Sequence, residues 1–220
     1  MNAAQRLRSG DGVAIAVHDL GGRGRPVLLV HAAGLHGLVW RPLAARLTRR
    51  YRCVAPDLRS HGDSDAAPGH DLDWRGFARD VIAVVTGLGL RRPLAVGHSC
   101  GATALLLAEQ DRPGTFGALY CFEPVVVPAD PPLGPDPGNW LAAAARQRRA
   151  AFASREVALQ YFGSKPPLAA LHPAVLRAYV EHGFADREGH GVLLKCRPEH
   201  EALVHEMATA HDCYSRLGRV

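Results

Sequence analysis

A single serine, Ser99, stands between two glycines in the stretch VGHSCGA at residues 96–102. It follows a short apolar run and precedes a helix-like run, so it lies at a strand-to-helix corner. A serine at such a corner can cap the helix that follows it. The pattern Gly-x-Ser-x-Gly also forms a tight, strained turn that holds the hydroxyl out at the edge of a sheet, where it can act as a nucleophile. The surrounding elements decide between these two roles.

Five apolar runs predict strands, and they cover residues 13–20, 27–32, 51–58, 93–99 and 116–127. The first reads as a strand near an edge, and the others are apolar enough to be buried on both faces of a parallel sheet. Helical spacing lies between them at residues 38–49, 74–88 and 103–110, with Asp71 or Asp73 as the N-cap of the second helix. This alternation predicts an α/β fold, a doubly wound and mostly parallel sheet.

The character of the chain changes after Val127. A proline-rich linker, PADPPLGPDPGN, leads into a stretch that is rich in Ala, Arg, Leu and Glu at helical spacing, with one short strand predicted at residues 191–196. We therefore expect a core over residues 1–127, a helical cap over residues 128–211 that lies on the sheet, and a short final segment at residues 212–220.

Three motifs in the same order resemble those of the α/β-hydrolase family: VLLVHAAG at residues 27–34, APDLRSHGDSD at residues 55–65, and the elbow VGHSCG at residues 96–101. The resemblance covers about residues 10–127 and implies that Ser99 is the nucleophile of an acyl transfer. Ala32 and Ser60 stand where the family usually has glycine, but neither change removes a reacting group.

The resemblance also implies an oxyanion hole made of backbone N–H groups. One donor comes from Cys100, which follows the nucleophile, and the other from Ala33, two residues beyond His31. Since the donors are backbone groups, the side chains at these two positions matter little. We interpret His31 and His98 as hydrogen-bonded histidines that shape loops, and we expect the Cys100 thiol to point away from the elbow.

The remaining members of a Ser, acid and His triad are harder to place. Glu123, at the end of the strand that follows the elbow, is a tentative acid, and a loop-shaping role fits it equally well. His190 superficially resembles the terminal histidine of the family, but that role would require the loss of at least one core strand. No further pair of apolar strands follows residue 127, and residues 212–220 read as the lead-in to an absent core strand. We therefore expect the fold to lack its last core strands.

Two functions from different classes follow. The first is an esterase-like hydrolase that uses Ser99 through an acyl-enzyme on a small or medium apolar acyl substrate, without a cofactor. The second is a non-catalytic or truncated protein of the same fold, which lacks a complete triad. Aromatic residues of the expected cap, namely Trp140, Phe152, Tyr161 and Phe162, either line a substrate pocket or form the core of the cap.

Composition excludes several other classes. The formal charge of +5 comes almost wholly from arginine, and the clusters at residues 49–52 and 146–149 read as solvated basic faces rather than a nucleic-acid site. Five scattered cysteines without a C-x-x-C pair indicate neither disulfides nor zinc. His205 and His211 are six residues apart, whereas a zinc helix needs a spacing of four. No metal, nucleic-acid or membrane partner is therefore expected, and the chain reads as cytoplasmic. The sequence does not indicate an oligomeric state, but an exposed sheet edge would favour association.

Overall fold

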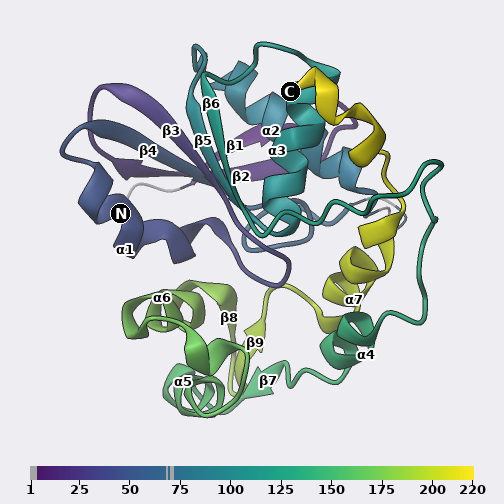
Figure 1. Cartoon of the computed structure of the whole chain (residues 1–220). Coiled ribbons are helices and arrows are strands. Elements are labelled where there is room, and N and C mark those ends of the chain that lie inside the picture. The colour runs from purple at the N-terminus through teal and green to yellow at the C-terminus, as the bar shows by residue number, and fades with distance from the viewer. Residues whose placement is uncertain (1–3, 68, 70–71) are drawn as a thin grey trace.

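The computed structural model describes residues 4–67, 69 and 72–220 of the chain. Its main sheet has six strands in the order β1-β2-β4-β3-β5-β6 (Figure 1). Strands β3 to β6 are parallel to one another. At one side of the sheet, β2 pairs antiparallel with β4 and β1 pairs antiparallel with β2. The strands are β1 (Gln5–Arg8), β2 (Ala14–Gly21), β3 (Arg25–Val30), β4 (Tyr51–Pro56), β5 (Leu94–His98) and β6 (Ala118–Phe122). The predicted α/β class with a mostly parallel sheet is confirmed; β1, which is short and charged, was not predicted.

Helices cover both faces of this sheet. One face carries the 3-10 turn η1 (Gly37–Trp40) and helix α1 (Arg41–Leu47); the other carries α2 (Trp74–Gly87) and α3 (Cys100–Asp111) (Figure 1). The predicted helix at residues 38–49 thus begins as a 3-10 turn. Helix α2 begins where predicted, because the Asp73 side chain accepts a hydrogen bond from the Arg75 N–H at 3.0 Å. Asp71, the alternative cap, lies outside the described residues.

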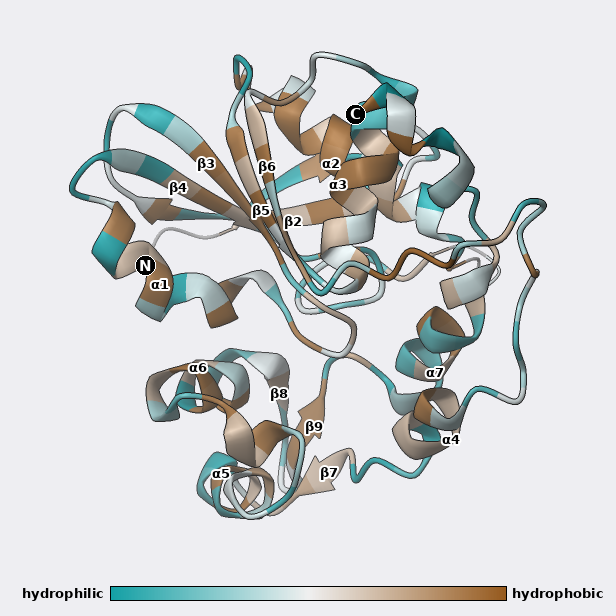
Figure 2. Ribbon diagram, viewed as in Figure 1, coloured by the Kyte–Doolittle hydropathy of each residue, from teal (hydrophilic) through white to brown (hydrophobic). Residues whose placement is uncertain are grey.

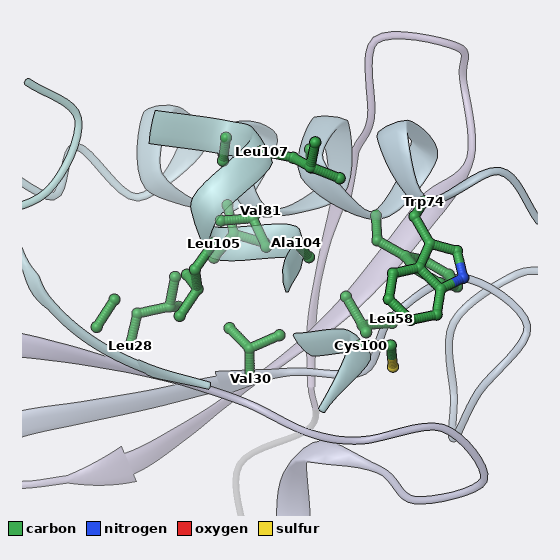
Figure 3. Packing of buried hydrophobic residues seen from close by; sticks show 14 of the residues in the cluster. Leu28, Val30, Leu58, Trp74, Val81, Cys100, Ala104, Leu105 and Leu107 are labelled. Carbon is green, nitrogen blue, oxygen red and sulfur yellow. The ribbon is translucent and has the colours of Figure 1, made fainter. Parts of the chain in front are cut away.

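The main core lies between the sheet and helices α2 and α3. Leu28 and Val30 of β3 lie in one cluster with Val81 of α2 and Leu105 of α3, all of them fully buried (Figure 3). The hydropathy of these strands is high along their central residues, as Figure 2 shows. Each fully buried side chain of this size contributes about 1.5–3 kcal/mol of transfer free energy. This core fixes the strand ends from which the candidate site is built.

Strand β6 differs from its prediction. It ends at Phe122 instead of Val127, and it is the outermost strand of the sheet. Leu119 and Cys121 pack against the α2 and α3 core, whereas Tyr120 is 64% exposed and Phe122 is 48% exposed. The prediction of a further buried strand was wrong, because alternate residues of β6 are exposed along one face.

The segment at residues 140–206, hereafter the cap segment, contains more strand than predicted. Its helices are α4 (Trp140–Arg146), α5 (Arg155–Gly163), α6 (Pro173–Gly183) and α7 (Pro198–Glu206), with the 3-10 turn η3 (Leu168–Ala170) after α5. The predicted strand forms as β9 (Gly191–Leu194), but it pairs with β7 (Ala151–Phe152) and β8 (Phe184–Arg187) in a second sheet. β7 is too short and β8 too polar for an apolar pattern to indicate them.

The cap segment has an aromatic core of its own. Phe152, Phe162, Tyr179 and Phe184 are buried together, with Phe162 and Tyr179 in edge contact at a centroid distance of 5.6 Å. Trp140, by contrast, is 74% exposed. Of the aromatic residues considered as pocket walls, Phe152 and Phe162 are therefore core residues.

The end of the chain returns to the main domain. Turns η4 (Met207–Thr209) and η5 (Tyr214–Arg219) follow α7, and the Gln110 amide of α3 donates to the Cys213 carbonyl at 2.9 Å. The prediction that residues 212–220 lead into a further core strand stays a prediction. No helix within the described part of the chain has the length and apolarity needed to cross a bilayer.

Candidate active site

Ser99 occupies a sharp corner between β5 and α3. Its φ of 53° and ψ of −123° are unusual for a residue with a side chain and indicate stored backbone strain. The flanking glycines are required by close packing. A Cβ at Gly97 would lie 2.5 Å from the Cα of Ala102, and a Cβ at Gly101 would collide with the carbonyl oxygen of His31. The predicted elbow is therefore present, and its glycines serve the close approach of strand and helix.

The corner places Ser99 at the N-terminus of α3, a helix of 12 residues. The Ser99 N–H donates to the Phe122 carbonyl at 2.9 Å, which ties the elbow to β6. The N–H groups of the first helical turn have no intrahelical acceptor, and the helix dipole favours negative charge at that end. Cys100 is the first residue of this turn, the position at which the resemblance expects an oxyanion donor.

Ala33, the other expected donor, lies in the loop at residues 31–37 that follows β3. This loop contacts the elbow directly, because Gly101 packs against the carbonyl oxygen of His31. The Cys100 thiol is fully buried beside the same loop, where burial raises its pKa to about 12 and the N–H groups of Ala33 and Gly101 partly oppose that rise. The structure therefore brings Ser99, Cys100 and Ala33 together, and the Cys100 side chain faces the core as expected.

Buried histidines hold the 31–37 loop to the loop after β4. His31 Nε2 accepts from the Leu58 N–H at 2.9 Å and its Nδ1 lies 2.8 Å from the Ala32 carbonyl oxygen. His61 Nε2 accepts from the Gly34 N–H at 3.1 Å and its Nδ1 lies 2.9 Å from the Arg59 carbonyl oxygen. Both rings are therefore neutral with the proton on Nδ1. The loop-shaping role predicted for His31 agrees with these contacts.

Burial keeps these rings neutral. It lowers the pKa of His31 to about 3 and that of His36 to about 4, and it also lowers the pKa of His61. His36 Nε2 donates to the Tyr179 carbonyl oxygen of α6 at 3.2 Å, which links the loop to the cap segment. None of these three histidines is poised to carry a proton near neutral pH.

Asp57 anchors the other end of the loop. Its carboxylate accepts from the Gly37 N–H at 2.6 Å, from the Asp63 N–H at 2.8 Å and from His18 Nε2 at 3.0 Å. Burial alone would raise the pKa of Asp57, but the hydrogen bond from His18 and the neighbouring histidines hold it well below its usual value. Among the described residues, His18, Asp57 and Asp63 form the one group with metal-binding spacing, and the Asp57 oxygens already have hydrogen-bond donors.

Ser60 lies in the loop after β4 at a φ of 63°. Because glycine adopts this backbone conformation without steric cost, the glycine usual at this position in the resembling family has a physical reason. The Ser60 side chain offsets part of this steric cost, since its Oγ accepts a hydrogen bond from the Ala67 N–H at 3.1 Å. The departure noted in the sequence is therefore accommodated in a strained turn.

Glu123, the tentative acid, lies beside the elbow but not on Ser99. Its Oε2 is 3.8 Å from His98 Nε2, and its side chain is 73% exposed. The φ of 47° at Glu123 shows that the chain turns sharply after β6. His98 also stands against Phe122, with ring centroids 5.1 Å apart. Glu123 therefore contacts the histidine next to Ser99, and its role as a triad acid stays a prediction.

A base for Ser99 is not evident in the described part of the chain. The Ser99 side chain makes no cap hydrogen bond to the first turn of α3. His190 lies in the exposed turn between β8 and β9 of the cap segment. His211 stacks on Trp74 of α2, with ring centroids 5.0 Å apart. Neither histidine is brought to the elbow.

Two grooves in the described structure lie away from Ser99. The larger, about 640 Å³, runs between β2, α1 and α6 and is lined by His18, Arg41 and His182 among others. The smaller, about 360 Å³, lies at the ends of α2 and α3. Ser99 lines neither of these two grooves.

Sequence reasoning missed the contacts that the cap segment makes with the 31–37 loop. Glu201 of α7 is 2% exposed and lies against Gly34. Its Oε1 is 2.7 Å from Nη2 of Arg148, although Arg148 belongs to a cluster expected to be solvated. Only a carboxylate at a buried helical position, in the run PEHEALV, could have indicated this contact.

Comparison with known proteins then gives the family. A family model described as "Alpha/beta hydrolase family" matches residues 27–214. The chain belongs to the alpha/beta hydrolase family. Membership agrees with the elbow at Ser99 and the parallel sheet, and it supports an enzyme.

Similar alpha/beta hydrolase sequences include a non-heme haloperoxidase from Rhodococcus erythropolis. It is 38% identical over 130 residues, which are 58% of this chain and 44% of that protein. A non-heme chloroperoxidase from Streptomyces lividans is 35% identical over 131 residues, 56% of this chain and 47% of that protein. This chain spans under half the length of these two relatives.

Solved structures of the alpha/beta hydrolase fold are also similar. E-2-(acetamidomethylene)succinate hydrolase aligns with a TM-score of 0.76 at 22% identity, over 93% of this chain and 72% of that one. An esterase from Rhodococcus sp. ECU1013 aligns with a TM-score of 0.67 at 21% identity, over 96% of this chain and 75% of that one. At these identities the likeness shows the fold.

Proposed function

We propose that this alpha/beta hydrolase cleaves acyl substrates through an acyl-enzyme on Ser99, in the manner of an esterase. The observation that carries the proposal is the strained elbow, which places the Ser99 hydroxyl at the N-terminus of α3 beside the 31–37 loop. Strain at one residue and the N-terminus of a helix thus lie next to the loop that would supply the second donor. A structural cap would need none of this strain, and Ser99 makes no side-chain cap hydrogen bond.

The reaction follows from this arrangement. Ser99 Oγ attacks the acyl carbonyl carbon and gives up its proton to a base, and negative charge develops on the carbonyl oxygen. The N–H groups of Cys100 and Ala33, which are in place before the reaction begins, stabilise that charge as it develops. Collapse expels the alcohol and leaves the acyl group on Ser99, and water then releases the acid. These steps require neither a metal nor a cofactor, so none is part of the proposal.

The aromatic residues of the cap segment suggest the substrate class. A small or medium apolar acyl group fits a cap segment with several aromatic residues, of which Tyr161 is partly buried and Trp140 is exposed. An esterase and a hydrolase of an acetamido acid are among the proteins of similar fold. We therefore propose a small molecule as the partner of this site.

A second candidate function has its own supporting observation. Neither His190 nor His211 is brought to Ser99, and an unactivated serine is a poor nucleophile. A non-catalytic protein of this fold would keep the elbow for its packing and bind rather than cleave its ligand. The two candidates differ in whether Ser99 reacts.

Hydrolysis of p-nitrophenyl esters of increasing chain length, from acetate to octanoate, tests the proposal. The wild-type protein should release p-nitrophenol faster than buffer and show a burst equal to the enzyme concentration, and Ser99→Ala should abolish both. Ser164→Ala, an exposed serine at the end of α5, is the matched control and should not change the rate. A rate that is equal in wild type and Ser99→Ala would favour the non-catalytic protein.

A further inference from the structure

The cap segment touches the 31–37 loop at the residue next to the proposed donor. Gly34 follows Ala33 and has a φ of 73°. A Cβ placed on Gly34 would lie 2.6 Å from Oε1, 2.7 Å from Cδ and 2.9 Å from Oε2 of Glu201. The carboxylate of Glu201 therefore lies flat against the Gly34 backbone, at a distance that only glycine permits.

Glu201 is an unusual residue to bury at this contact. It is 2% exposed, and its charged partner is Arg148, whose Nη2 lies 2.7 Å from Oε1. His205, one turn along α7, lies 3.9 Å from the same oxygen. Oε2 has no hydrogen-bond partner among the described residues. A buried ion pair that leaves one oxygen unsatisfied gains little stability over an apolar pair, because desolvation offsets the attraction.

Gly34 is held from its other side as well. Its N–H donates to His61 Nε2 at 3.1 Å, and His61 is fixed in turn by the Arg59 carbonyl oxygen. Arg148 also donates to the Tyr179 hydroxyl at 3.4 Å, and the Tyr179 carbonyl accepts from His36 of the loop. Gly34 thus lies between His61 of the core and the carboxylate of Glu201. Arg148 and Tyr179 of the cap segment connect this carboxylate to His36 at the other end of the loop.

We propose that Glu201 is a positioning residue: with Arg148 it presses Gly34 toward His61 and so fixes the direction of the Ala33 N–H. The inference rests on the proposed function, in which Ala33 is an oxyanion donor. A donor must be aligned before the reaction to stabilise the transition state, so a small rotation at Gly34 lowers the rate without removing any reacting group. The cap segment then helps to complete the site.

The test compares Glu201→Gln with Glu206→Gln. The first variant keeps the shape and an oxygen for Arg148 but removes the charge. The second removes a charge from the same helix, where Glu206 pairs with Nη2 of Arg146 at 2.7 Å. Two quantities are measured for each protein, below the onset of its unfolding transition: the rate at which a fluorophosphonate labels Ser99, and the hydrogen-exchange rates of the Ala33 and Gly34 amides.

We expect Glu201→Gln to slow the labelling of Ser99 by about 10-fold to 100-fold, which does not exceed the loss of rate seen when a whole oxyanion donor is removed. The same variant should speed hydrogen exchange at the Gly34 amide. Glu206→Gln should leave both quantities at wild-type values. Equal labelling of Glu201→Gln and wild type, or equal slowing in the two variants, would overturn the positioning role.

The two proposals fail in different ways. If wild-type Ser99 is not labelled at all, the proposed function is wrong, and the positioning role falls with it. Faster exchange at Gly34 in Glu201→Gln but not in Glu206→Gln would then show only that Glu201 holds the 31–37 loop, whereas labelled wild-type Ser99 with unchanged exchange at Gly34 would refute the positioning role alone.

Discussion

The backbone around Ser99 leaves no space for a side chain at either flanking glycine. The glycine before the serine faces the Cα of Ala102 in α3, and the glycine after it faces the carbonyl of β3. Backbone atoms cannot move aside as a flexible side chain can, so overpacking here must displace the helix or the strand.

Gly97→Ala should therefore lower the free energy of unfolding by about 1–3 kcal/mol, the usual cost of overpacking a close contact. It should also displace α3 and lower the reactivity of Ser99. Urea unfolding measures the first effect. Gly10→Ala, where an added Cβ meets nothing within 4 Å, is the control and should change stability by less than about 1 kcal/mol. Equal effects of the two substitutions would contradict this packing account.

The buried histidines make stability depend on pH. The folded-state pKa is about 3 for His31 and about 4 for His36, against an ordinary value of 6.5. Below pH 6.5 the unfolded chain binds protons that the folded chain does not, so stability is fully present above pH 6.5 and is lost as the pH falls.

We predict that the free energy of unfolding falls by about 1.4 kcal/mol per pH unit for each of these histidines between pH 6 and pH 4. His61 and Asp57, whose folded-state pKa values are also lowered, act in the same direction. Urea titrations at intervals of half a pH unit measure the slope. His36→Asn should make it shallower, whereas exchange of the exposed His190 for Gln should not. A stability that is constant from pH 6.5 to pH 4 would show that these rings are not buried in neutral form.

At the scale of elements, a buried ion pair fixes the loop after β4 to helix α2. Arg59, 1% exposed, contacts Asp80 of α2 at 2.7 Å and Asp11 at 2.7 Å. Asp80 is fully buried and also accepts from the Arg59 N–H at 3.2 Å. The same loop carries His61, whose Nε2 accepts from the Gly34 N–H. The Arg59–Asp80 ion pair is therefore connected to the candidate site through His61.

Asp80→Ala should cost about 3–5 kcal/mol of unfolding free energy, because it leaves the buried Arg59 with only the partly exposed Asp11 as a charged partner. Arg52→Ala is the control: its ion pair with Asp19 is solvent-exposed and should contribute at most about 1 kcal/mol. Chemical unfolding of the two variants checks the contrast. A loss below about 1 kcal/mol for Asp80→Ala would mean that the loop is held without this pair.

The sequence indicated the elements whose pattern is regular and local. The elbow glycines, the apolar strands and the Asp73 cap of α2 each follow from residues close together in the chain. Strand β6 was placed correctly but described wrongly as buried, because burial depends on what lies beside a strand and its own residues do not encode that.

The contacts between the cap segment and the loop could not be predicted. Glu201 and Gly34 are far apart in sequence and close in space, and a glutamate in a short helix usually faces water. Arg148 looked like part of a solvated cluster, yet its guanidinium pairs with that glutamate. Such pairings depend on how distant parts of the chain pack together, which local sequence patterns do not encode.

At the scale of the whole molecule, β6 is an outermost strand, and among the described residues its outer edge pairs with no other strand. Tyr120 and Phe122 are exposed on this outermost strand. Unpaired strand edges with apolar side chains favour association.

We predict that these 220 residues associate as their concentration rises. Light scattering over a range of concentrations measures this, and Tyr120→Lys should reduce it, since a charge on an edge strand opposes pairing. Leu133→Lys, at an exposed position in the linker, should not. A wild-type protein that stays a monodisperse monomer would contradict the prediction.

The proposed chemistry of the whole molecule centres on Ser99 as a nucleophile. The measurement that tests this most directly is an intact-mass spectrum before and after treatment with a fluorophosphonate, with Ser99→Ala as the control. The account predicts a single adduct on the wild-type protein and none on the variant. An unmodified wild-type protein, folded and of the mass of these 220 residues, would contradict it and leave the elbow as a structural feature of the fold.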